Sequence, residues 1–181
     1  VELNKFVQQV PLDHTFDMKV DKKLFDILMN LVSSELKQPG SPDIHIIMMT
    51  IQRLLKVKGF YSAIPRCTIV PLIQALQHRD ATVVLSALNA IAWILDCRVA
   101  TTDKKFDKAQ AELAAKQAFY ESKGYDVLVN RVLLHFSKTQ QHGVVSKVVD
   151  MLALDLVDNA NTTRFVGIQK LLKLLTPHID L

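Results

Sequence analysis

The segment from Ile69 to Leu95, IVPLIQALQHRDATVVLSALNAIAWIL, constrains the fold most, because it joins two apolar runs of helical period by a short polar turn. Pro71 lies in the first turn of the first run, where its missing N–H is tolerated. Asp80 ends the polar turn and can accept a hydrogen bond from the free N–H groups that begin the second helix. A connection this short folds two amphipathic helices back on each other. The segment therefore predicts an antiparallel helix pair.

The same helix–turn–helix plan recurs along the chain. The further pairs are 24–55, more loosely, and the runs 125–136 and 144–156 with a polar loop between them. Aligning Ile46 with Val83 gives a period of 37 residues, and aligning Val83 with Val145 gives 62. A helix-pair period near 40 is typical of armadillo and HEAT solenoids, in which stacked pairs share one core. We therefore predict an all-α, right-handed superhelix, an α-solenoid of about three helix-pair repeats.

The longer second spacing indicates an insertion. Residues 100–124 are rich in alanine and charge, which predicts one inserted helix. Four of its residues would lie on roughly one side, namely Phe106, Ala109, Leu113 and Tyr120. A final helix is predicted over Thr162–Thr176.

The N-terminal part is divided at residue 20. Residues 1–20, interrupted by Pro11, are expected to form an irregular lead, and Asp21 to cap the first helix. The predicted buried stripe of that helix is Leu24, Ile27, Leu28, Leu31 and Val32. Ser41 is expected to cap the next helix. Residues 21–181 would then form one helical-repeat domain, and because the chain begins with Val1 we expect it to be a fragment of a longer protein.

The sequence contains no arrangement typical of catalysis. It has no glycine-rich phosphate loop, and its six histidines lack the spacings that bind zinc. We expect no enzymatic activity, no cofactor, no metal and no small-molecule substrate. Cys67 and Cys97 form no Cys-x-x-Cys pair, which favours reduced thiols and a cytoplasmic protein.

Charge is distributed unevenly. Between Ile44 and Arg79 there is no acidic residue, and five basic residues occur: Arg53, Lys56, Lys58, Arg66 and Arg79. The stretch is either a solvated surface or a docking patch for an acidic protein or, weakly, an anionic membrane. A net charge of only +4, and the lack of interleaved aromatic residues, disfavour nucleic acid as the partner.

The segment IVPLIQALQHRDATVVLSALNAIA is also similar to the armadillo repeat pattern, with matching positions at Pro71, Leu72, Ile73, Leu76, Asp80, Val83 or Val84, Ala87 and Ala90. Together with QRLLKVKGFYSAI, YDVLVNRVLLHF and HGVVSKVVDMLAL, it resembles the repeats of large endosomal J-domain co-chaperones of receptor-mediated endocytosis. The His-Pro-Asp of a J domain is absent. IHIIMMTIQRLLKVKGF followed by this repeat also resembles the armadillo region of diaphanous-type formins.

These resemblances imply three readings. The first is a non-enzymatic protein–protein interaction scaffold in membrane or endosomal trafficking. The second is a formin-type region that binds a GTPase and an autoinhibitory helix and so regulates actin assembly. The third is a structural repeat segment with no ligand of its own.

Overall fold

A computed structural model describes residues 2–9, 18–38, 41, 43–57, 69–96 and 108–160. Every element in these ranges is helical, which confirms the all-α prediction for this part of the chain. The elements are α1 (Glu2–Gln9), α2 (Met18–Glu35), α3 (Asp43–Leu55), α4 (Val70–Ala75), α5 (Ala81–Asp96), α6 (Lys108–Glu121), α7 (Gly124–Val127), the π-helix η2 (Leu128–Leu133), α8 (Leu134–Lys138) and α9 (His142–Ala160). The predicted final helix Thr162–Thr176 lies outside the described ranges, and so do all other predictions for residues 58–68, 97–107 and 161–181.

The α4–α5 pair has the local structure that its sequence predicts. Pro71 lies in the first turn of α4, and Asp80 precedes α5 and accepts a 2.8 Å hydrogen bond from the Thr82 N–H on Oδ1. The second apolar run of this segment forms the buried stripe of α5, with Val84, Ala87, Leu88, Ile91 and Leu95 each at most 9% exposed. This agreement follows because helix caps and apolar periodicity are set by residues within one or two turns.

Helix α3 also starts as predicted. The Ser41 Oγ accepts a 3.3 Å hydrogen bond from the Asp43 N–H, and the same hydroxyl donates to the Glu35 carboxylate. These contacts connect Ser41 to the end of α2 and to the start of α3. The apolar residues that α3 buries are Ile44, Met48, Ile51, Leu54 and Leu55.

The predicted stripe of α2 is partly wrong. Ile27 is 54% exposed and Leu31 is 38% exposed, whereas Phe25 and Met29 are buried beside Leu28 and Val32. The sequence LFDILMNLV carries apolar residues on more than one side, so two overlapping stripes fit its period. Contact with α3 and α4 decides which of them is buried.

The prediction of an irregular lead over residues 1–20 does not hold for 2–9 and 18–20, the part of that range which the structure describes. α1 occupies Glu2–Gln9 and contacts α3, and α2 begins at Met18, so that Asp21 lies inside a helix and does not cap it. The sequence did contain a signal for α1, because Leu3, Phe6, Val7 and Val10 follow the i, i+3, i+4, i+7 spacing of an amphipathic helix.

The inserted helix is present as α6, but it buries a different face from the predicted one. Ala109 and Leu113 are exposed, the latter by 62%, whereas Ala115 and Phe119 are buried. Lys116 is 8% exposed and its Nζ lies 2.8 Å from the Glu112 carboxylate one turn earlier. Small alanines surround the helix on most sides, so the sequence pattern alone does not specify which face packs.

The helix after α6 departs from simple α geometry. Lys123 adopts a left-handed conformation at φ 59°, and α7, η2 and α8 then follow without a break to Lys138. Leu128, Val132 and Phe136 are all buried at spacings of four. Because an α-helix has 3.6 residues per turn, such a row drifts around it, and the wider π turn reduces this drift.

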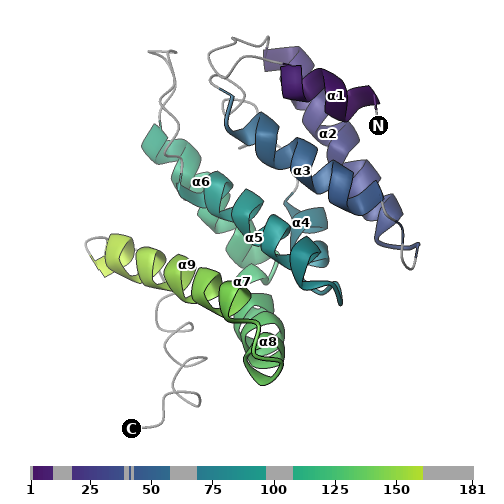
Figure 1. The fold of residues 1–181 in the computed structure, drawn as a ribbon. Coiled ribbons are helices and arrows are strands. Elements are labelled where there is room, and N and C mark those ends of the chain that lie inside the picture. The colour runs from purple at the N-terminus through teal and green to yellow at the C-terminus, as the bar shows by residue number, and fades with distance from the viewer. Residues whose placement is uncertain are drawn as a thin grey trace, which may run out of the picture.

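The helices form two adjoining rows (Figure 1). α3, α5 and α9 lie side by side in that order, and α2, α4 and η2–α8 pack against them as their respective partners. α3 and α5 run in the same direction, because His45 lies beside Asp80 at their beginnings and the Gln52 Nε2 donates to the Ser86 carbonyl 3.1 Å away further along. One continuous hydrophobic core connects the rows. Among the helices of the described ranges, none combines the length and apolar character needed to cross a bilayer.

Candidate partner-binding groove

Of the five basic residues predicted as a docking patch, the structure describes Arg53, Lys56 and Arg79, and these three do not lie together. Arg53 is half-buried near the end of α3, and Lys56 is exposed just beyond it. Arg79 is exposed in the turn between α4 and α5. Lys58 and Arg66 lie outside the described residues.

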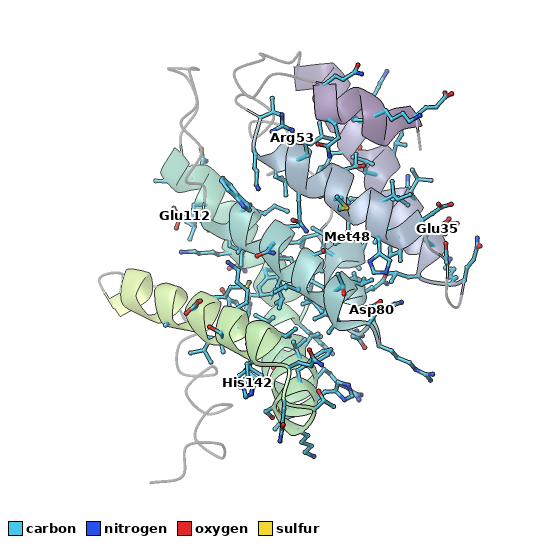
Figure 2. The ribbon with its side chains drawn as sticks, in the orientation of Figure 1. Glu35, Met48, Arg53, Asp80, Glu112 and His142 are labelled. Atoms are coloured by element: carbon cyan, nitrogen blue, oxygen red, sulfur yellow. The ribbon has the colours of Figure 1, made fainter. Side chains whose placement is uncertain are left out.

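Arg79 is far from Arg53 because it lies at the other end of α3. The neighbouring Asp80 contacts His45 in the first turn of that helix, with 3.3 Å between Oδ2 and Nε2. Arg53 follows His45 by eight residues, which corresponds to roughly 12 Å along the helix axis at 1.5 Å per residue. Figure 2 shows Asp80 and Arg53 toward opposite ends of α3. The described basic residues are therefore divided between the two ends of α3.

At the Arg79 end, a groove of about 420 Å³ opens between the α4–α5 turn and the η2–α8 segment. Its charged and titratable lining residues are all basic: His78, Arg79, Arg131, His135 and Lys138. The remaining lining residues are neutral, and include Gln77, Asn130 and the apolar side chains of Leu76, Leu134 and Phe136. The groove thus combines a cationic rim with partly apolar walls.

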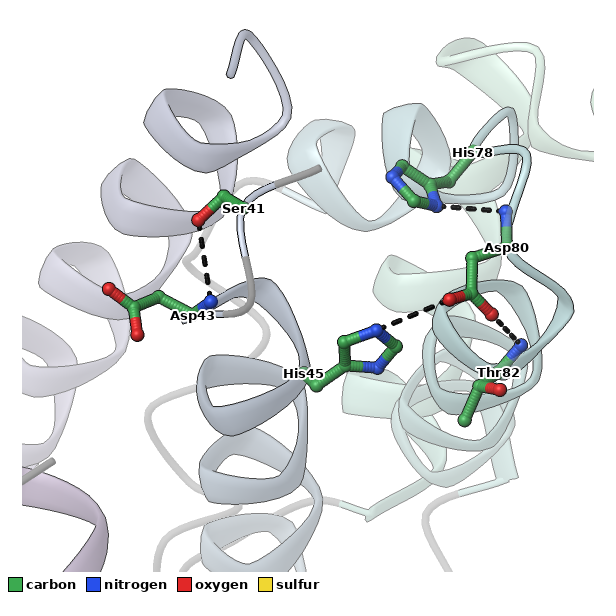
Figure 3. A network of polar contacts seen from close by, with 6 residues as sticks. All are labelled: Ser41, Asp43, His45, His78, Asp80 and Thr82. Carbon is green, nitrogen blue, oxygen red and sulfur yellow. Dashed lines mark hydrogen bonds and ion pairs between the residues drawn. The ribbon is translucent and has the colours of Figure 1, made fainter. Parts of the chain in front are cut away.

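The turn that carries Arg79 is held by a polar network around Asp80 (Figure 3). Asp80 Oδ1 accepts from the Thr82 N–H at 2.8 Å, and Oδ2 faces His45 on α3. The Asp80 N–H in turn donates to His78 Nδ1 at 3.1 Å. These contacts connect the turn to α3 and α5, and they direct the carboxylate toward His45 and Thr82.

The same contacts explain the electrostatics of Asp80. The hydrogen bond from the Thr82 backbone N–H, with smaller contributions from the Thr82 hydroxyl, His45 and His78, lowers the pKa of the Asp80 carboxyl below its ordinary value of 3.8. A hydrogen bond to the charged form of a carboxyl favours ionisation. Asp80 therefore remains an anion beside the groove, but its two oxygens already have partners.

The opposite wall is fixed by the core. Leu128 and Val132 of η2 and Phe136 of α8 are buried, while Arg131 and His135 on the same segment are exposed. The His135 ring packs edge-on against Phe136, with 4.8 Å between ring centroids. The π turn widens the backbone in the segment that provides Asn130 and Arg131 to the groove. Single π turns within helices often occur at functional sites.

The positive character of the groove arises where two acid-free stretches meet. Residues 44–79 contain no Asp or Glu, and neither do residues 127–149. The tertiary fold brings the end of the first stretch against the beginning of the second. Arg79, Arg131 and Lys138 are permanently charged at neutral pH, and no acidic side chain lines the cavity to neutralise them.

The sequence analysis singled out Arg79 but not the basic residues that line the groove with it, namely Arg131, His135 and Lys138. The signal that could have found them is the acid-free stretch 127–149, which has the same character as the stretch before Arg79. Within the ranges that the structure describes, no three His, Cys, Asp or Glu residues are grouped so that they could hold a metal ion.

Comparisons with known proteins identify no relative. No protein-family model matches the chain, and neither the curated proteins nor the solved structures contain a match.

Proposed function

We propose that this chain is an armadillo/HEAT-like segment, a right-handed α-solenoid, that acts as a non-enzymatic scaffold and binds an acidic segment of another protein in the basic groove. Three helix pairs support the solenoid assignment, since α2–α3, α4–α5 and η2/α8–α9 each contact the next pair through α3, α5 and α9. This arrangement agrees with the period of 37 residues between the first two pairs.

The observation that carries the proposed function is the acid-free lining of the groove. Arg79 and Arg131 are 52 positions apart in sequence, yet they line one cavity together with Lys138. Charged side chains of one sign repel one another, and a ligand of opposite charge that binds between them relieves this repulsion. A recess with apolar walls suits a protein segment, because side chains beside the acidic groups can be buried there.

The cellular context of the proposal comes from the resemblance to endosomal co-chaperone repeats. On that basis the acidic partner belongs to membrane or endosomal trafficking, and the scaffold acts in the cytoplasm. Sequencing the transcript that encodes residues 1–181, for any coding sequence on either side, tests this context directly. A J domain would support trafficking, and a proline-rich actin-assembly region would favour the formin reading.

Binding to a defined acidic peptide tests the groove. The probe is a fluorescein-labelled peptide of five Gly-Glu repeats, titrated with the wild-type chain and followed by fluorescence anisotropy at low and moderate salt. The groove variant combines Arg79→Glu and Arg131→Glu. The matched control combines Lys23→Glu and Lys56→Glu, which changes the net charge equally at exposed positions outside the groove lining.

We expect the groove variant to bind at least about tenfold more weakly, and the control to differ from wild type by less than about threefold. Added salt should weaken wild-type binding, because the attraction is electrostatic. Equal losses in both variants would show non-specific attraction, and a loss in the control alone would locate the site at the α3 end. No binding by the wild type would favour a structural segment without a ligand.

A further inference from the structure

We propose that the groove recognises a phosphorylated side chain, so that phosphorylation of the partner segment controls its binding. This inference rests on the proposed function and names the anionic group that the groove is built to receive. It follows from the number of cations, the supply of hydrogen-bond donors and the shape of the recess.

The charges favour a dianion over a carboxylate. Arg79, Arg131 and Lys138 place three permanent positive charges on the lining of one cavity. A single carboxylate carries one negative charge, so it leaves most of this repulsion uncompensated. A phosphate monoester carries about −1.5 to −2 at neutral pH and presents three acceptor oxygens. Arginine forks pair with such oxygens in a bidentate manner, and arginine clusters are a common way to read phosphorylated segments.

Neutral donors supplement these cations. His78 Nδ1 accepts the Asp80 N–H, so the proton of the neutral His78 ring is on Nε2, which is then a donor. Asn130 adds an amide donor on the other side of the groove. The carboxylate that would compete for these groups belongs to Asp80, and its oxygens are engaged by Thr82 and His45. The lining therefore offers charged and neutral donors with no acidic acceptor of its own.

The two sides of the groove are held before a ligand arrives. The Asp80 network fixes the turn with Arg79, and the burial of Phe136 fixes the segment with Arg131. A preorganised site loses less conformational entropy on binding than a mobile one. Leu76, Leu134 and Phe136 give the recess apolar walls that can pack against residues flanking the phosphorylated one. A recess of this kind favours a side chain of a protein segment over the flat surface of a membrane.

Three labelled peptides of the form Gly-Ala-Gly-X-Gly-Ala-Gly test the inference, with phosphoserine, glutamate or serine at X. Each is titrated with the wild-type chain, with Arg79→Gln, with Arg131→Gln and with the control Lys23→Gln. Vesicles containing phosphatidylserine form a separate arm. The acidic Gly-Glu peptide is measured in parallel, because it reports on the proposed function independently of phosphate. Circular dichroism and urea unfolding verify that each variant is folded.

We expect the phosphoserine peptide to bind at least about tenfold more tightly than the glutamate peptide, and the serine peptide not to bind. Each groove variant should lose about tenfold for phosphoserine, and Lys23→Gln should behave as wild type. Equal affinity for phosphoserine and glutamate, both dependent on Arg79, would overturn this inference and leave the proposed function standing. Binding to the vesicles that exceeds peptide binding would overturn it in favour of a membrane site. If neither the phosphoserine peptide nor the Gly-Glu peptide binds, both this inference and the proposed function are overturned.

Discussion

The α4–α5 pair and the segment from α6 to α8 differ in what determines their structure. In the first region, Pro71 and Asp80 lie where the sequence predicts, and the five stripe residues of α5 are buried. In the second, the helices are present as predicted, but α6 buries Phe119 where Leu113 was expected, and a π turn interrupts the helix that follows.

The two regions differ because interactions between near neighbours in sequence determine the structure of α4–α5, whereas contacts with other helices determine the orientation of α6. Asp80 caps α5 through a neighbour two residues away, and the stripe of α5 is unambiguous because polar residues mark its other side. α6 has alanine on most sides, so its orientation depends on what it contacts, namely α5 and α7. Where the sequence pattern is degenerate, tertiary packing makes the choice.

The largest expected effect comes from truncating one residue on the observed buried face of α6 and one residue on the face that the sequence predicted. Phe119 is fully buried and packs edge-on against Tyr125 with 4.9 Å between ring centroids, whereas Leu113 is 62% exposed. We expect Phe119→Ala to lower the free energy of unfolding by about 3–5 kcal/mol. Leu113→Ala should change it by less than about 0.5 kcal/mol. Urea unfolding followed by circular dichroism measures both free energies. A larger loss for Leu113→Ala than for Phe119→Ala would show that the face predicted from sequence is the buried one.

A smaller test concerns the glycine that follows α6. A Cβ added to Gly124 would overlap the Phe119 ring, whereas a Cβ on Gly143, in the first turn of α9, would meet no atom within 4 Å. We expect Gly124→Ala to destabilise the protein by about 1–3 kcal/mol through overpacking. Gly143→Ala should be neutral or stabilising by up to about 1 kcal/mol, because alanine favours helix over glycine. Thermal unfolding of the two variants separates them, and similar melting temperatures would contradict the close packing at Gly124.

The smallest expected effect probes the locally determined region. Asp80→Ala removes the cap of α5 and should cost about 0.5–2 kcal/mol, whereas Asp80→Asn keeps a capping oxygen and should cost less. The folded-state pKa of Asp80 is lowered, so its ionised form contributes stability above pH 3.8, and this contribution is lost as the pH falls through the lower folded value. Urea unfolding at several pH values should show wild type and Asp80→Asn converging in acid below pH 3.8. A constant difference would show that the charge of Asp80 does not contribute.

One of the two walls of the candidate site could be predicted from the sequence. The acid-free stretch that ends at Arg79 is visible in the sequence, and so is the turn that carries it. The predicted patch joined Arg79 to Arg53, Lys56, Lys58 and Arg66, which belong to the same acid-free stretch. In the structure, Arg79 lies near the start of α3 and Arg53 lies toward its end. The cations that line the groove with Arg79 are Arg131 and Lys138, from a helix pair further along the chain.

By itself, the sequence determined that this protein is built from amphipathic helices and where several of them begin, because caps, prolines and apolar periodicity act within a few residues. Only the tertiary structure decided which sides of α2 and α6 are buried and that two distant acid-free stretches meet in one groove. Those outcomes depend on contacts between helix pairs, and no short-range pattern encodes which surfaces two pairs present to each other.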